Sequence, residues 1–155
     1  MIWVIVAIIA GLVFLGGGAA RASGLDSIAS SSLYTPQAVL FAHAIARAEG
    51  TLNADGTLNT DTLGISRNNP GDIEDASGQL VSYGTLADGW NALYSQASGM
   101  LYGMSRIYNP QMTIAQAAFL YTGGDNSSGW ALTVASWMGV SINNTLEQVG
   151  GLMIA

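Results

Sequence analysis

The segment from Thr35 to Gly50 most constrains how this chain can fold, because it has the pattern of one helix that is apolar on most of its surface. Thr is favoured at the position before a helix, Pro at its first position, here Pro36, and Gly after its last turn. A helix that is apolar around most of its surface is expected to be buried. Its apolar residues include Val39, Leu40, Ala42, Ile45, Ala46 and Ala48.

Glu49 stands at the end of this helix, directly before Gly50. The carboxyl end of a helix carries partial negative charge and the core is apolar, and both effects raise the pKa of a carboxyl group. A carboxylic acid that keeps its proton near neutral pH is what cleavage of a glycosidic bond requires. Glu49 is therefore the candidate catalytic residue, and the competing interpretation is a solvated residue of the last turn.

Composition excludes several classes of function. The 155 residues suffice for one domain with a core, and they include four arginines, no lysine and ten acidic residues, for a net charge of −6. A chain without clustered cations is a poor nucleic-acid binder, so we expect no such partner. There is no cysteine and one histidine, His43, which we expect to pack or to form a local hydrogen bond. We expect neither a metal nor a cofactor.

The first twenty residues carry no charged side chain and are strongly apolar. About twenty helical residues span the roughly 30 Å of a bilayer core. Residues 1–21 are therefore predicted to be a retained single-pass membrane anchor, with residues 2–20 in lipid, followed by a small, Ser-rich tether over residues 22–32. The alternative is a cleaved signal peptide. Arg21, the one charge that flanks the anchor, favours an orientation in which the chain after the anchor stays inside the cell. A wall-degrading function requires the opposite orientation.

The globular domain is predicted to run from residue 33 to residue 155 as a mostly α fold with one small β element. Two short strands are expected at Ile73 and at residues 80–83. Capping patterns and apolar residues at helical spacing predict the later helices. These are expected to start at Thr85, at Thr113 and at Ser127 or Ser128, with a last short helix over residues 141–149.

Five short motifs follow one another along the chain: Ala46 to Gly50, Arg67 to Ile73, Gly89 to Leu93, Thr113 to Tyr121 with the Gly123 to Asn126 loop, and Trp137 to Val140. This ordered set resembles the phage-encoded, lysozyme-like lytic transglycosylases, which include peptidoglycan-degrading proteins carried in virions. The resemblance covers about Pro36 to Leu146. Two departures stand out: Asp72 replaces the usual Asn, and the loop after Tyr121 lacks the usual Ala-Pro-Pro.

The resemblance implies a lysozyme-like α+β fold and cleavage of the β-1,4 bond between N-acetylmuramic acid and N-acetylglucosamine in peptidoglycan glycan strands. It makes Glu49 the acid. The candidate substrate-binding residues are Arg67, Asn68, Asn69, Asp72 and Tyr121. Each candidate also has a structural alternative. The two asparagines can shape the Asn69-Pro70-Gly71 turn, and Tyr121 can pack in the core. Arg67 can form an ion pair with Asp72 or Glu74.

A transglycosylase needs one carboxyl group, because the nucleophile is the sugar's own 6-hydroxyl, whereas a hydrolysing lysozyme commonly needs a second. We expect a transglycosylase that acts in phage entry or virion-associated wall penetration. It would sit in the virion membrane or in the bacterial inner membrane facing the periplasm, with other virion proteins as further candidate partners. The alternatives are a hydrolytic muramidase and a non-catalytic structural membrane protein of the virion. Candidates for a second carboxylate are Asp55, Asp61, Asp72, Glu74 and Asp75.

Overall fold

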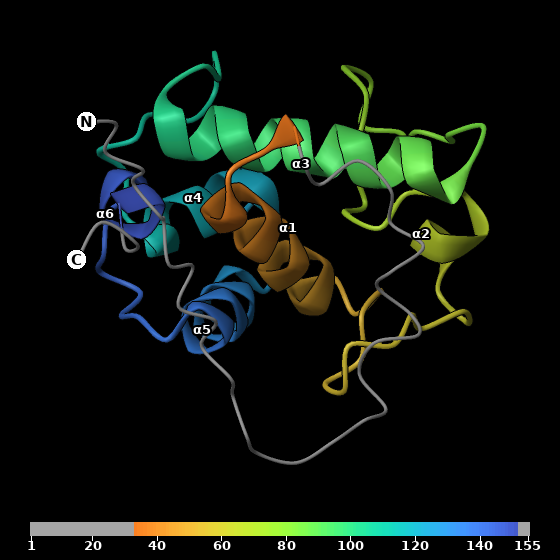
Figure 1. The fold of residues 1–155 in the computed structure, drawn as a ribbon, viewed down its shortest axis with the longest axis horizontal. Coiled ribbons are helices and arrows are strands. Elements are labelled where there is room, and N and C mark those ends of the chain that lie inside the picture. Colours follow the sequence, from red (N-terminus) through yellow and green to blue (C-terminus); the bar gives the residue numbers. More distant parts are fainter. Residues whose placement is uncertain (1–32, 152–155) are drawn as a thin grey trace, which may run out of the picture.

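The computed structural model describes residues 33–151, and within them the chain forms six helices around a single core. Figure 1 shows α1 in the middle of the domain, with α3 along one side and α5 on the opposite side. Helix α1 contacts α3, α5 and α6, while α4 packs on α5 and α6 packs on α3. The helices are α1 (Pro36–Ala48), α2 (Leu63–Ser66), α3 (Leu86–Tyr102), α4 (Ile114–Tyr121), α5 (Ser127–Met138) and α6 (Leu146–Gly151).

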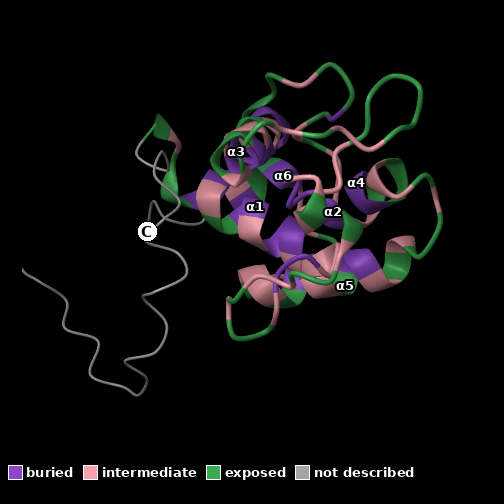
Figure 2. Ribbon diagram, turned by 90° about the vertical axis from the view of Figure 1, so that its right-hand side faces the viewer, coloured by how far each residue is buried: buried purple, intermediate pink, exposed green. Residues whose placement is uncertain are grey.

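The predicted central helix is confirmed as α1. The Thr35 side chain accepts a hydrogen bond from the Ala38 N–H at 3.2 Å, and Gly50 ends the helix in a left-handed conformation. Phe41 and Ile45 are fully buried, and the buried stretches of α1 face the interior in Figure 2. Because this helix lies at the centre, the position of its last residues fixes the position of Glu49.

The first residues of the later helices are set more by capping hydrogen bonds than by the spacing of apolar residues. Reciprocal capping boxes at Thr85 and Thr113 start α3 and α4, as predicted. The prediction of a Ser127 or Ser128 cap is wrong, because α5 begins after Asn126, which has a φ of 51° and makes no side-chain cap bond. The last helix begins at Leu146 rather than near residue 141, since the Thr145 and Gln148 side chains each bond the other's backbone N–H.

The predicted fold class, a mostly α, lysozyme-like α+β domain with a small β element after an N-terminal transmembrane helix, is wrong in this form. The described residues contain helices and isolated β-bridges such as Glu74 with Leu80, but no strand. None of the described helices is both long and apolar enough to cross a bilayer. The predicted anchor over residues 1–21 and the tether over residues 22–32 lie outside the described residues.

The strands expected at Ile73 and residues 80–83 reduce to one bridge because a side chain replaces strand pairing. The Asn69 amide donates to the carbonyls of Ile73 and Val81 at 2.8 and 3.0 Å, and its oxygen accepts from the Ile73 N–H at 2.9 Å. The buried Asn69 side chain therefore joins the two segments, and regular strand pairing does not continue along them.

Candidate active site

Glu49 directly follows α1, where it occupies the capping position in an ordinary helical conformation. The indole N–H of Trp130, a buried residue of α5, donates to Oε1 of Glu49 at 2.7 Å. Packing of α1 against α5 brings the two side chains together across 81 positions of sequence. The carboxyl group is thereby held in one orientation at the edge of the core.

The pKa of Glu49 is raised to about 7, from an ordinary value of 4.5, and burial is the main cause. The hydrogen bond from Trp130 acts in the opposite direction, and the negative charges of Asp72 and Glu74 raise the pKa further. The predicted upward shift is therefore confirmed. A carboxyl group with this pKa holds its proton in about half of the molecules at neutral pH and can both donate and accept it.

A cleft of ≈ 500 Å³ opens over Glu49. It lies between the end of α1, the turn that carries Asp72 and Glu74, the end of α4 with Tyr121, and the start of α5 with Trp130. The cleft is large enough for part of a polymer and is open to solvent, so a substrate can reach the Glu49 carboxyl group.

Two further hollows follow the cleft through shared lining residues, and the three together are called the groove below. A hollow of ≈ 230 Å³ shares Asp72, Glu74, Leu120 and Tyr121 with the cleft, and a hollow of ≈ 520 Å³ shares Ile73 and Gln96 with the second. Tyrosines lie along all three. A row of hollows of this kind offers space for successive units of a polymer.

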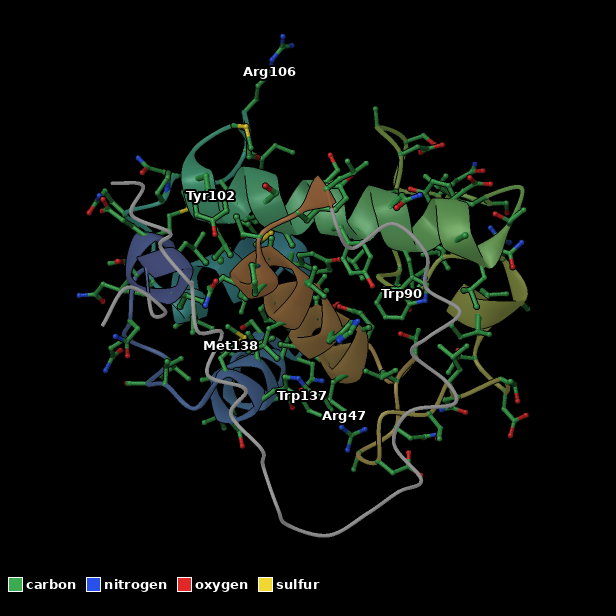
Figure 3. The ribbon with its side chains drawn as sticks, viewed as in Figure 1. Arg47, Trp90, Tyr102, Arg106, Trp137 and Met138 are labelled. Carbon is green, nitrogen blue, oxygen red and sulfur yellow. The ribbon has the colours of Figure 1, made fainter. Side chains whose placement is uncertain are left out.

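The charges around Glu49 are of one sign. The lining of the cleft includes Asp72, Glu74 and Asp125, and no arginine. Arg47 donates to the Leu52 carbonyl at 3.1 Å, and Arg106 is exposed and projects away from the body of the domain in Figure 3. Within residues 33–151, no guanidinium lines the cleft beside these carboxyl groups.

The Asn69-Pro70-Gly71 turn leads into Asp72 and Glu74, which form the floor of the cleft, and it is tied down from two sides. The buried hydroxyl of Thr51 lies between the carbonyls of Ala46 and Pro70. The Tyr121 hydroxyl donates to the Gly71 carbonyl at 2.6 Å. These contacts fix the floor relative to Glu49 on one side and relative to α4 on the other.

The structure brings some predicted site residues together and not others. Glu49, Asp72 and Tyr121 line one cleft. Arg67 donates to the Leu80 carbonyl at 2.9 Å and Asn68 to the Tyr83 carbonyl at 3.0 Å, so both hold the loop. Asn69 is fully buried. The three residues Arg67, Asn68 and Asn69 do not line the cleft.

The candidates for a second carboxylate separate in the same way. Asp72 and Glu74 line the cleft, whereas Asp55 and Asp75 accept hydrogen bonds within their own turns, which lower the pKa of each. Asp61 is exposed and does not line the cleft. The turn after Pro70 therefore supplies both carboxyl groups that accompany Glu49 on the floor of the cleft.

Sequence reasoning missed Trp130 and Thr51. No local pattern marks either residue, because each acts through a partner far along the chain or through a backbone carbonyl. His43 behaves as predicted: its ring packs edge-on against Trp90 with Nε2 3.3 Å from the Tyr94 hydroxyl, and burial lowers its pKa.

The raised pKa of Glu49 predicts how stability depends on pH. The folded state holds the Glu49 proton more tightly than the unfolded state between pH 4.5 and about 7, so the free energy of unfolding falls as pH rises through this window. Glu49→Gln removes this contribution and becomes more stable than the wild type above pH 7, by on the order of 1–3 kcal/mol. Urea unfolding of both proteins at pH 4, 5.5 and 8 checks this; equal slopes with pH would contradict it.

The chemistry of the cleft must carry any assignment of function. Its central feature is a carboxyl group that titrates near neutral pH, is oriented by Trp130 and opens onto a groove. No metal-binding cluster of acidic or histidine side chains occurs in residues 33–151. No family model matches the chain, and neither does any curated protein or solved structure.

Proposed function

We propose that this protein is a peptidoglycan lytic transglycosylase that cleaves the β-1,4 bond between N-acetylmuramic acid and N-acetylglucosamine. The observation that carries the proposal is Glu49, a carboxyl group with a pKa of about 7 that opens onto a groove. The resemblance of the ordered motifs to phage lytic transglycosylases supports the choice of substrate. By the same resemblance we propose a role in wall penetration at phage entry.

In the proposed reaction, protonated Glu49 gives its proton to the glycosidic oxygen. The bond between this oxygen and C1 of the muramic acid breaks with its electron pair moving to the oxygen, and C1 gains oxocarbenium character. The Glu49 carboxylate then takes the proton of the 6-hydroxyl, whose oxygen bonds to C1 and closes a 1,6-anhydro ring. The acid is restored, and no water is consumed.

The surroundings of Glu49 suit these two proton transfers. Burial favours the protonated form needed for the first, and the Trp130 hydrogen bond stabilises the carboxylate that the first step leaves. The groove beyond the cleft offers space for neighbouring sugars, whose binding would hold the reacting bond against Glu49.

Mass analysis of the reaction products tests the proposal. Purified peptidoglycan digested with the protein should give muropeptides with 1,6-anhydro ends, about one water lighter than reducing ends. Glu49→Gln serves as the matched control and should give neither product. Reducing ends instead would identify a hydrolytic muramidase, for which Asp72 and Glu74 in the cleft supply candidate second carboxylates. Release of no muropeptide by the wild type would contradict both assignments.

A further inference from the structure

Asp72 lies on the floor of the cleft, and both its backbone conformation and the environment of its carboxyl group are unfavourable. Its backbone has a φ of 46°, in the left-handed region where residues other than glycine are uncommon. Its Oδ1 is buried and receives no hydrogen bond from the described residues. Unusual backbone conformations and unsatisfied buried polar atoms cluster at functional sites, so their combination in one cleft residue motivates a functional hypothesis.

The position of the Asp72 carboxyl group is built by a neighbouring glycine. A Cβ at Gly64 would lie 2.0 Å from Oδ1 of Asp72 and 2.7 Å from the Asn69 carbonyl oxygen. Only a glycine at position 64 leaves this room. The carboxyl group therefore occupies a specific place beside α2, and the same residue also lines the cleft over Glu49.

In the part of the chain that the structure describes, no arginine lines the cleft beside Asp72. Two carboxyl groups that share a partly desolvated site do not both ionise readily, so the charge on one keeps the proton on the other. We propose that Asp72 is a positioning residue for the proposed reaction: its carboxyl group is held on the cleft that Glu49 also lines, and its negative charge there adds to burial in holding the proton on Glu49. This inference rests on the proposed function of Glu49.

Among the acidic groups around Glu49, Asp72 raises the Glu49 pKa most. Burial raises the pKa of Tyr108 to about 12 and that of Tyr121 well above 10, so both phenols are neutral at pH 7. Asp72 acts on the pKa of Glu49 more strongly than Glu74, which is exposed. The groups that face Glu49 are Asp72, Glu74 and Asp125 as acids, Tyr108 and Tyr121 as phenols, and Trp130 as a hydrogen-bond donor.

The test is the pH profile of kcat/KM for Asp72→Asn on purified glycan strands. Asparagine is nearly isosteric and tolerates the left-handed conformation, so the variant should fold, as a melting curve would verify. The alkaline limb should move to lower pH by about half a pH unit or more, because the pKa of Glu49 falls when the charge is removed. An unmoved limb, with or without a loss of rate, would overturn the proposal.

Two control variants bracket the expected shift. Glu74→Gln removes an exposed charge and should move the limb in the same direction by less than Asp72→Asn. Trp130→Phe removes the donor that lowers the pKa of Glu49 and should move the limb to higher pH. A larger shift for Glu74→Gln than for Asp72→Asn would assign the role to Glu74 and overturn the proposal.

A direct titration keeps the inference separate from the proposed activity. In the wild-type protein, ¹³C NMR of the carboxyl groups should show Asp72 losing its proton at lower pH than Glu49, with Glu49 titrating near 7. Loss of the Glu49 proton first would overturn the proposal. If the wild type cleaves no glycan, the proposed function fails while this titration still decides the charge relation between the two residues.

Discussion

Glu49→Gln should lower kcat for glycan cleavage by about 10²- to 10⁴-fold, the contribution typical of a general acid. The amide cannot give a proton to the glycosidic oxygen, nor can it take one from the 6-hydroxyl. The substitution is nearly isosteric, and the amide oxygen can still accept the hydrogen bond that Trp130 gives to Oε1 of Glu49. The structure of the cleft should therefore survive while the chemistry is lost.

The measurement is the rate of release of soluble muropeptides at pH 5 and pH 7, with binding to glycan strands measured in parallel. Glu147→Gln is a suitable control, because Glu147 is exposed on α6 and does not line the cleft. It should cleave as the wild type does. Full activity in Glu49→Gln would remove Glu49 from the reaction, whereas retained binding without cleavage in the wild type would indicate a non-catalytic wall-binding protein.

Gly89→Ala should destabilise the domain by about 3 kcal/mol, the upper part of the range for overpacking in a core. A Cβ at Gly89 would lie 1.7 Å from the Asn68 carbonyl oxygen and 2.9 Å from Cδ of Pro70. Neither obstacle is the end of a flexible side chain. Helix α3 would have to move away from the turn that leads into the floor of the cleft, so activity should fall together with stability.

Gly99→Ala provides a matched control on the same helix. The nearest atom to a Cβ there is the Ser105 backbone nitrogen at 3.6 Å, which is an ordinary contact. Alanine is favoured over glycine inside a helix, so this variant should gain about 0.5–1 kcal/mol. Urea unfolding of both variants measures the two effects, and a loss of similar size at both positions would show that close approach at Gly89 is not the cause.

The sequence predicted those parts of the fold whose causes are local. Thr35, Pro36 and Gly50 delimit α1 by capping and backbone preferences that involve only nearby residues. The reciprocal caps at Thr85 and Thr113 were predictable for the same reason. The raised pKa of Glu49 also followed from its place at the end of a buried helix.

The remainder depends on contacts that no local pattern encodes. The expected strands failed because Asn69 bonds both segments with its side chain, a role that its sequence neighbours do not reveal. The Trp130 hydrogen bond to Glu49 requires α5 to pack on α1. The resemblance singled out Asp72, but it did not indicate that Glu74 lies with it in the cleft, since only the folded turn brings the two together.

The turn under the cleft affects which parts of this domain can tolerate mutation. A helix is redundant, because many equivalent bonds share its stability and the loss of one leaves the rest. The segment from Thr51 to Tyr83 instead relies heavily on dissimilar side-chain links, such as the buried Asn69 amide and the buried Thr51 hydroxyl. Mutational tolerance should therefore be lowest in an irregular loop and higher along the outer faces of the regular helices.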